Sequence, residues 1–586
     1  EGAYQFSDEK LAILENAGML FKQLELDYLL PDFYFQKNEY FVNVLKNQFD
    51  QFSEFEQISF EQKIRHNFDE FESFAFQNPD KNEFLNSAMN NQFLLKGLFL
   101  NNKNRLVKSI QNSDSETVKK YEEWRKLRAV LSKEYALSPN RRRGDFKDLV
   151  NRADELESEL ARLSEPFKEA NKFTTWEDIQ TALKPDEVLI EFSGFEFLTG
   201  ERTVESKPKI YVAYLLKSGD REPQMIPLFK EKEMPALRKT RTLYSFQKRT
   251  NTQNLYDLVW QPLSEHLEGV KTVYYTPSGV LYSVNFGAIP VSENEIIADR
   301  FELHNLSGSR QLMFPFEHSG EGQDALIFGG IEYDFENENP ILTENTESKS
   351  EEFFVSRSLG DSFRALRGED WKYLDWTEKE ADEIQKILKN SNMSVTAKKG
   401  LEATEESFKK IGESGNSPQI IHLATHGYFF PKADPSANSG FQASRHPLIR
   451  SGLILAGANA AWKGEETFSG KEDGILTAYE IAQTDLSQTE LVVLSACDTG
   501  LGEIEGKEGV FGLQRAFKSA GAKYLLMSLW KVNDADTYDF MTTFYRYRKE
   551  KNKTIPEAYR TAQQKLKEKY SQPFDPHAWA GFVLVE

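Results

Sequence analysis

The chain has one cysteine, Cys497, among its 586 residues. A single thiol excludes an internal disulfide, and it also excludes zinc or iron–sulfur sites that need several cysteines. Such low cysteine usage is typical of a reducing compartment, so we expect a cytoplasmic location. Because only one thiol remains, Cys497 is the first residue to consider for nucleophilic chemistry.

Long apolar runs and an excess of positive charge are also absent. No stretch reaches 18 apolar residues, so the sequence predicts no membrane-spanning helix. Asp and Glu number 92 against 72 Lys and Arg, which gives a formal net charge of −20. This charge repels phosphate backbones and anionic lipids, so we expect neither membrane binding nor direct DNA binding. The missing Met before Glu1 predicts a piece of a longer protein.

Length and apolar spacing predict several domains, the first of them helical. At roughly 150 residues per domain, the length predicts about four compact units. Residues 1–110 predict a helical, repeat-like region, in which Phe60, Ile64 and Phe68 recur at helical spacing. A regular 34-residue repeat is not found. Residues 111–186 predict a long antiparallel helical hairpin and a linker.

From residue 187 onward the spacing of apolar residues changes from helical to strand-like. A first series of strands is predicted over 188–192, 210–214, 225–228 and 272–275. A second series has strands over 324–328, 393–397 and 419–425, with helices over 377–388 and 404–411 between them. This alternation predicts a mostly parallel sheet with helices on both faces.

The cysteine follows a short apolar run rich in β-branched residues, 491–496, which predicts a buried strand. Cys497 comes at the carboxyl end of this strand, and a glycine-rich stretch, 500–509, follows it. In open α/β sheets, ligands bind at the carboxyl ends of the strands. The position of Cys497 is therefore that of a candidate site residue.

A second apolar run, 419–425, ends in His426 and Gly427. If the two strands are parallel neighbours, His426 and Cys497 meet at one edge of the sheet. An imidazole can accept the proton of a thiol and so produce a nucleophilic thiolate. The backbone N–H groups of Gly427 and Cys497 are the candidate donors to a developing oxyanion.

The cysteine and the histidines of these strands also have structural explanations. A lone cysteine at a strand end is more often a small buried apolar residue than a nucleophile. His422, in the middle of its strand, is expected to satisfy a hydrogen bond in the core. An inert signalling scaffold and a thiol-based acyltransferase remain open as alternatives. No G-x-S-x-G, H-E-x-x-H or phosphate-loop motif is present, and we expect no metal and no cofactor.

Two blocks resemble the CHAT peptidases, which are caspase-like and separase-like cysteine proteases often linked to tetratricopeptide repeats. They are His422-Leu-Ala-Thr-His426-Gly-Tyr-Phe and Leu494-Ser-Ala-Cys497-Asp-Thr-Gly500. The segment Ser528-Leu-Trp-Lys-Val-Asn-Asp534 is similar to the family as well. The two active-site blocks are specific to the family.

The resemblance implies an α/β caspase-like sheet in two halves, an inactive one over 187–322 and an active one over 323–586. It implies that Cys497 is the nucleophile and His426 its partner in an endopeptidase with a protein substrate. Family members act in regulated bacterial proteolysis, including antiviral defence. Some are activated by an RNA-guided complex, and others cleave a gasdermin. The helical region is where we expect an activating partner to bind.

The residue that the enzyme prefers before the cleaved bond depends on a pocket beside the nucleophile. Acidic residues crowd this part of the sequence, and Asp498 and Asp534 are two candidates for the lining. Asp473 is a further acidic candidate. Trp530 is a candidate wall, with burial in the core as the alternative. An acidic pocket favours a basic or polar residue, whereas solvated loop carboxylates would express no preference.

Overall fold

The computed structural model describes residues 23–49, 52–97, 114–137, 140–163, 174–198, 207–234, 254–314, 323–335, 370–413, 416–430, 439–465, 472–495, 503–504, 510–530, 532–570 and 576–586, with a few single positions between them. The chain forms two compact units. The first unit consists of Glu1–Arg128, Lys147–Phe316 and Ile504–Gly509. The second unit consists of Ala129–Phe146, Glu317–Glu503 and Val510–Glu586. The boundaries predicted from the sequence remain predictions.

Long helices open the first unit, as the sequence predicts. They are α2 (Leu30–Gln48), α3 (Glu54–Gln77) and α4 (Asn82–Gly97), followed by α6 (Ser115–Ala136) and α7 (Phe146–Leu163). Helix α3 begins at a capping box, in which Ser53 and Glu56 satisfy each other's backbone N–H groups. Helices α6 and α7 pack through an apolar seam of Trp124, Leu156 and Leu160.

A mixed five-stranded sheet follows, in the order β3-β2-β1-β4-β5. The strands are β1 (Glu187–Glu196), β2 (Lys209–Lys217), β3 (Gln224–Lys230), β4 (Thr272–Thr276) and β5 (Glu302–Asn305). The pairs β1–β2 and β2–β3 are antiparallel, whereas β1–β4 and β4–β5 are parallel. For this first series the prediction of a mostly parallel sheet is wrong. Only six residues connect β2 to β3, and a connection this short joins antiparallel strands.

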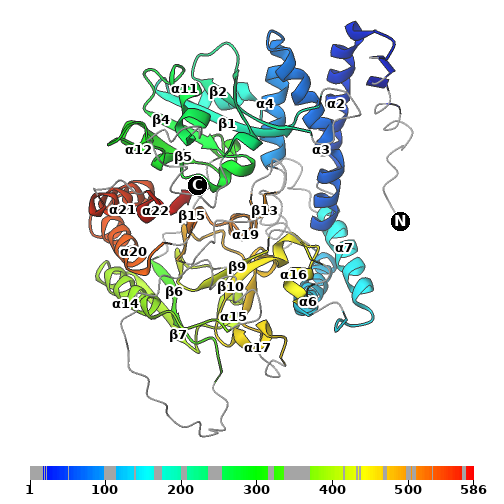
Figure 1. The fold of residues 1–586 in the computed structure, drawn as a ribbon. Coiled ribbons are helices and arrows are strands. Elements are labelled where there is room, and N and C mark those ends of the chain that lie inside the picture. The colour runs from blue at the N-terminus through cyan, green and yellow to red at the C-terminus, as the bar shows by residue number, and fades with distance from the viewer. Residues whose placement is uncertain are drawn as a thin grey trace. The chain divides into compact units, whose positions relative to one another are not determined.

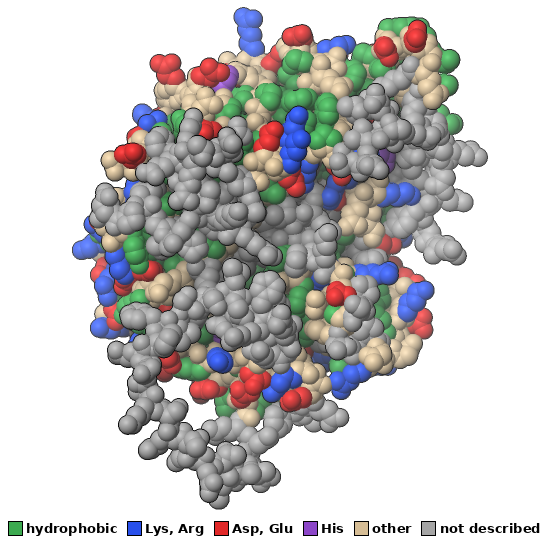
Figure 2. All heavy atoms as spheres, in the orientation of Figure 1, with side chains coloured by type: hydrophobic (Ala, Val, Ile, Leu, Met, Phe, Trp, Pro, Cys, Tyr) green, Lys and Arg blue, Asp and Glu red, His purple; other side chains and the backbone are tan. Residues whose placement is uncertain are grey.

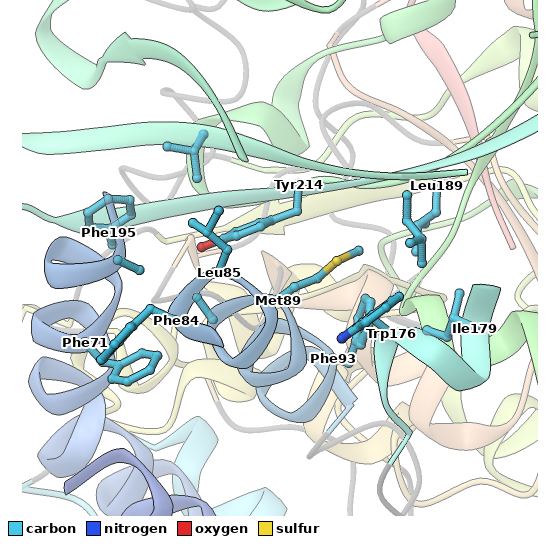
Figure 3. Close-up of a cluster of buried hydrophobic side chains, with 14 of the residues drawn as sticks. Phe71, Phe84, Leu85, Met89, Phe93, Trp176, Ile179, Leu189, Phe195 and Tyr214 are labelled. Atoms are coloured by element: carbon cyan, nitrogen blue, oxygen red, sulfur yellow. The ribbon is translucent and has the colours of Figure 1, made fainter. Parts of the chain in front are cut away.

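The core of the first unit joins these helices to the sheet. Phe71 of α3 and Phe84 of α4 lie beside each other, with ring centroids 5.5 Å apart. On the sheet side, Leu189, Phe195 and Tyr214 belong to the same cluster (Figure 3). The Phe-rich helical segments therefore bury their aromatic rings against β1 and β2.

Shorter elements complete the first unit. The helices are α9 (Trp176–Ala182), α11 (Gln261–Ser264) and α12 (Ile297–Arg300), and a π-helical turn spans Tyr256–Trp260. Short 3-10 turns span Asp27–Leu29, Glu231–Glu233, Gly279–Ser283, Phe286–Ala288 and Ser309–Leu312.

An ion pair between Lys96 and Glu191 is fully buried at the end of α4. Lys96 Nζ lies 2.5 Å from Glu191 Oε1 and donates a hydrogen bond to the carbonyl of Phe192 at 2.6 Å. The hydroxyls of Thr276 and Ser309 donate to the two oxygens of Glu191. A charge buried this deeply is tolerated only when it is paired and hydrogen-bonded, and this network provides both.

The second unit contains a six-stranded sheet in the order β16-β15-β12-β8-β6-β7. The strands are β6 (Asp324–Ile331), β7 (Ser394–Gly400), β8 (Ile420–Leu423), β12 (Leu491–Leu494), β15 (Tyr524–Ser528) and β16 (Phe582–Val585). All neighbours are parallel except β15 and β16. Here the prediction of a mostly parallel sheet is confirmed.

Helices cover both faces of this sheet. The helices are α14 (Asp375–Asn390), α20 (Asp534–Lys549) and α21 (Ile555–Lys569) on one side, and α15 (Glu405–Lys409) and α19 (Leu513–Ala520) on the other. Helices α14, α20 and α21 pack side by side (Figure 1). His422 of β8 contacts Tyr545 of α20, whereas the ring of Phe328 on β6 faces Phe408 of α15. Phe328 pairs in register with Leu423, so both side chains are on the same face of the sheet. His422 precedes Leu423 in β8 and therefore points to the opposite face. The two contacts thus lie on opposite faces.

A small three-stranded antiparallel sheet, β11-β10-β9, branches from the carboxyl end of β8. Its strands are β9 (His426–Phe429), β10 (Ser451–Ile454) and β11 (Ile475–Thr477). The apolar run at 419–425 therefore does not continue as one strand into the histidine, since His426 begins a new strand. Other short elements are α16 (Gly440–Ala443), α17 (Ala458–Trp462), α18 (Ala478–Ile481), α22 (Pro576–Trp579), β13 (Glu503–Ile504), β14 (Val510–Phe511) and a 3-10 turn (Pro447–Ile449).

Acidic and basic side chains are interspersed on the described part of the face shown in Figure 2. Among the described residues, no helix is long and apolar enough to cross a membrane.

The ion pair of Lys96 and Glu191 predicts a strong coupling in stability. We expect Lys96→Met to lower the free energy of unfolding by about 3–5 kcal/mol, because it leaves a buried carboxylate without its cation. The double variant Lys96→Met/Glu191→Gln should lose less unfolding free energy than Lys96→Met and Glu191→Gln lose together. We expect the difference to exceed about 1 kcal/mol. Urea unfolding of the four proteins measures this. Additive losses would show that the two charges do not stabilise each other.

Candidate functional site

The pairing of β8 with β12 defines the candidate site in the second unit. The two strands are parallel neighbours, with His422 beside Val493 and Leu423 beside Leu494. The strand that precedes His426 and the strand that precedes Cys497 thus meet the condition stated from the sequence, that they are parallel neighbours. Beyond the strand ends, the N–H of Ser495 donates to the carbonyl of Leu423 at 2.9 Å. The segments that lead to His426 and Cys497 thus leave the sheet at the same edge.

His426 is held by the backbone of a segment far from it in the sequence. Its Nε2 lies 2.8 Å from the carbonyl oxygen of Lys372. Because a carbonyl only accepts, Nε2 carries the proton, and Nδ1 is the nitrogen that can act as a base. The ring lies between those of Trp371 and Tyr333, with centroid distances of 5.0 and 5.2 Å. The contacts therefore select both the tautomer and the ring position.

Asn459 holds both segments that enclose the imidazole. Its side chain is fully buried. Asn459 Oδ1 accepts from the N–H of Trp371 at 2.7 Å, and Nδ2 donates to the carbonyl of Trp371 at 3.1 Å. The N–H of Asn459 donates to the carbonyl of Tyr333 at 3.0 Å. One residue thus fixes the backbone on each side of His426.

Neither Lys372 nor Asn459 was found from the sequence. The part of Lys372 that contacts His426 is its carbonyl group, which every residue has. Asn459 had a weak signal, because it follows Gly457, which adopts φ +78°. A Cβ at this glycine would overlap the ring of Phe335.

The remaining residues of the predicted dyad and oxyanion hole are described only in part. Gly427 is the second residue of β9, is partly exposed, and pairs in register with Leu453. Cys497 and Asp498 lie outside the described residues. The approach of Cys497 to His426 therefore stays a prediction, as do the roles of both backbone N–H groups in an oxyanion hole.

A pocket opens where β8, β12 and β15 end. It encloses about 430 Å³, including the part open to solvent. Its polar lining consists of Thr377, Glu380, Thr425, Ser495, Ser528, Asp534 and Thr537, and its apolar lining of Leu374, Trp376, Val532 and Phe582. Asp534, the first residue of α20, is thus part of the lining.

Two other predicted pocket residues lie elsewhere. Trp530 is buried, with Nε1 close to Gly581, and it is not part of the lining. Asp473 belongs to a separate cluster with Glu405, Glu480 and Lys409. Lys409 Nζ lies 3.1 Å from Glu405 and 3.0 Å from Glu480. The structure therefore separates the acidic residues that looked equivalent in the sequence.

The cluster around Lys409 supports the small sheet that contains His426. Glu405 Oε2 accepts from the N–H of Gly474, directly before β11. Ser132, near the end of α6, donates to Glu480 Oε1 at 2.5 Å. Burial, and next the charge of Glu480, raise the pKa of Asp473 from 3.8 to about 7. Among the described residues, no group of three or more His, Cys, Asp or Glu side chains could hold a metal ion.

The second unit is an α/β unit with a mostly parallel six-stranded sheet and helices on both faces. The profile of the CHAT domain matches residues 249–586, more than half of the chain. The chain therefore belongs to the CHAT domain family, and the family resemblance of the sequence is confirmed, as is the predicted fold class. No curated protein matches the chain.

Solved structures of cysteine proteases are similar to the chain at low identity. The Arg-specific cysteine proteinase gingipain R is 11% identical, over 56% of this chain and 65% of that chain, with a TM-score of 0.30. A complex of RgpB pro- and mature domains from Porphyromonas gingivalis is 10% identical, over 59% of this chain and 73% of that chain, at 0.32. The separase–securin complex of Saccharomyces cerevisiae is 9% identical, over 98% of this chain and 46% of that chain, at 0.37.

The clamp formed by Asn459 predicts the protonation pattern of His426. In the unmodified protein we expect ¹⁵N shifts of the His426 ring typical of the tautomer protonated on Nε2. In Asn459→Ala the Lys372 carbonyl loses its support, so we expect a mixture of tautomers. The exposed Asn294→Ala is the control, and His426→Gln assigns the signals. An unchanged spectrum in Asn459→Ala would show that Asn459 does not position the imidazole.

The raised pKa of Asp473 predicts how stability changes with pH. Because the folded state binds this proton more tightly than the unfolded state, the contribution of Asp473 to stability falls as pH rises from about 4 to about 7. We expect Asp473→Asn to flatten this dependence and to raise the melting temperature at pH 8. Asp485→Asn, which alters a similar N–H acceptor, is the control. A parallel pH dependence in Asp473→Asn and the unmodified protein would contradict the assignment.

Proposed function

We propose that the chain is a cysteine endopeptidase in which Cys497 is the nucleophile and His426 the base. The observation that carries the proposal is the orientation of His426. This residue follows the end of β8, and β8 pairs with β12, the strand that leads to Cys497. Ser495 is described and Cys497 follows it by two residues, so their Cα atoms are at most about 7 Å apart. Membership of the CHAT domain family supports the same assignment.

The orientation of the imidazole accounts for each proton transfer of a peptidase. His426 Nδ1 takes the proton of the Cys497 thiol, and the thiolate attacks the carbonyl carbon of the peptide bond. The N–H groups of Gly427 and Cys497 stabilise the oxyanion of the tetrahedral intermediate. The imidazolium then gives its proton to the leaving amine, which leaves a thioester. Water activated by His426 hydrolyses the thioester and restores the thiol.

The Lys372 carbonyl replaces the carboxylate that orients the histidine in other triads. It accepts a hydrogen bond from Nε2–H throughout, so the imidazolium stays in place while it is formed. A neutral carbonyl stabilises the imidazolium less than a carboxylate does, so the orientation of the ring is its main contribution. Lys372 acts here through its backbone, and a substitution of its side chain should therefore matter little.

The pocket at the ends of β8, β12 and β15 is proposed as the specificity pocket. It is lined by Ser495, two residues before the nucleophile, and by Thr425, directly before the base. Asp534 is proposed to contribute negative charge to it, and Asp498 remains a candidate. Trp530 is buried and outside this lining, so its role as a pocket wall stays a prediction.

We propose a regulated bacterial protease that cleaves a protein substrate, such as a gasdermin, in defence or signalling. An activating protein or RNA-guided complex is proposed to bind the helical region. The end of α6 supports regulation through that helix, because Ser132 and Lys133, which belong to the second unit, contact Glu480 and Glu472 of the same unit. A change in α6 would thus reach the loop that precedes β11, and β11 pairs with β10, the neighbour of β9.

Alkylation of the only thiol tests the dyad. We expect fast, pH-dependent labelling of Cys497 by iodoacetamide, measured by intact mass, because the imidazole promotes the thiolate. In His426→Ala, labelling near neutral pH should slow by roughly 10-fold or more, and peptide hydrolysis should fall by about 100-fold or more. Cys497→Ala should abolish both readouts.

His266→Ala, which alters a histidine of the first unit, is the matched control for His426→Ala. It should leave labelling and hydrolysis unchanged. Equal labelling rates in the unmodified protein and in His426→Ala would favour an inert scaffold. Fast labelling with acyl transfer to an amine, but without peptide cleavage, would favour an acyltransferase.

A further inference from the structure

Glu380 is a buried carboxylate in the lining of the pocket. It lies on α14 and is 2% exposed. Neither of its oxygens makes a hydrogen bond within the described part of the chain, and Oε1 is buried without a hydrogen-bond partner. The Oγ of Ser495, which lines the same pocket, is also buried without a partner. Burial of a carboxylate without hydrogen bonds is unfavourable, so this arrangement requires an explanation.

His422 satisfies Glu380 only in part. The hydroxyl of Tyr545 is 3.3 Å from His422 Nδ1. Burial, and next the Glu380 carboxylate, raise the pKa of Tyr545, so the hydroxyl keeps its proton. His422 Nε2 is 3.0 Å from Glu380 Oε1 but is not aligned for a hydrogen bond. A buried carboxylate without an aligned donor keeps part of its desolvation cost.

The lining of the pocket suits a long cationic side chain. Leu374, Trp376, Val532 and Phe582 provide apolar surface for the methylene groups of such a chain. Hydroxyls of the lining can accept hydrogen bonds from an ammonium or guanidinium group. Asp534 adds a second carboxylate to the same pocket. An acidic substrate side chain would instead meet two carboxylates and no described Lys or Arg in the lining.

We infer that Glu380 is a specificity-determining residue that binds a lysine or arginine side chain before the cleaved bond. The inference rests on the proposed function, because it names the substrate class of the same site. Glu380 would supply the negative charge of the ion pair. His422 of β8, which contacts Tyr545, would hold the carboxylate in place. The sequence pointed to other acidic residues for this pocket, all of them near Cys497 or at the start of α20.

The experiment compares two peptidyl acyloxymethyl ketones that differ only in the residue before the reactive group, lysine or norleucine. Norleucine has the same unbranched chain without the amine. The rate at which each labels Cys497 is followed by intact mass. We expect the unmodified protein to react roughly 10- to 100-fold faster with the lysine probe, as a hydrogen-bonded ion pair allows. Glu380→Gln should bring this ratio close to one, and Glu380→Asp should give an intermediate ratio.

Glu378→Gln is the matched control, because Glu378 lies on the same helix, is exposed, and accepts from Tyr373 at 2.8 Å. It should keep the ratio of the unmodified protein. Binding of agmatine, a small guanidinium compound, gives a readout that needs no thiol. We expect Cys497→Ala to bind agmatine in a titration followed by NMR, and Cys497→Ala/Glu380→Gln to lose this binding.

A ratio near or below one in the unmodified protein would overturn the inference, even if Glu380→Gln does not fold. A ratio that survives in folded Glu380→Gln would also overturn it. If both probes label Cys497 at rates that do not depend on His426, this would contradict the proposed function instead. In that case, loss of agmatine binding in Cys497→Ala/Glu380→Gln would still support a cation site at Glu380.

Discussion

The parallel pairing of β8 with β12 is the constraint on which the candidate site depends. Parallel strands end at the same edge of a sheet, and here the edge collects Thr425, Ser495 and the start of β9. Since β15 pairs with the other side of β12, Ser528 reaches the same place. The pocket is therefore a consequence of strand order. Side chains from α14 and α20 then close it, because these helices pack against each other on one face of the sheet.

Buried polar groups in this protein fall into two kinds. Lys96 and Glu191 satisfy each other and neighbouring hydroxyls, so their burial stabilises the attachment of α4 to β1. Asn459 likewise satisfies its side chain, with two hydrogen bonds to the backbone of Trp371 and one to the Asp334 carboxylate. Glu380 differs, because it is buried in a pocket lining without a hydrogen bond. A satisfied group is explained by the fold, whereas an unsatisfied group in a pocket lining is consistent with the ligand proposed above.

Regular elements were predictable where one periodicity extends over several residues. The strands β1, β2, β4 and β6 and helix α14 all lie where apolar spacing placed them. The antiparallel hairpins of the first sheet were missed, because direction depends on connection length and pairing rather than on apolar spacing. The break between β8 and β9 was also missed, since Ala424 and Thr425 do not interrupt the apolar pattern.

By itself, the sequence determined the family, the strand that precedes each dyad residue and the single thiol, because motifs and periodicity are local properties of the chain. Only the tertiary structure decided what surrounds them. The carbonyl of Lys372 at His426 and the carboxylate of Glu380 beneath the pocket are brought there by segments separated by tens of residues. Carbonyl groups are the same in every residue, and acidic residues are common in this chain. Only their three-dimensional arrangement distinguishes the ones that contact the site.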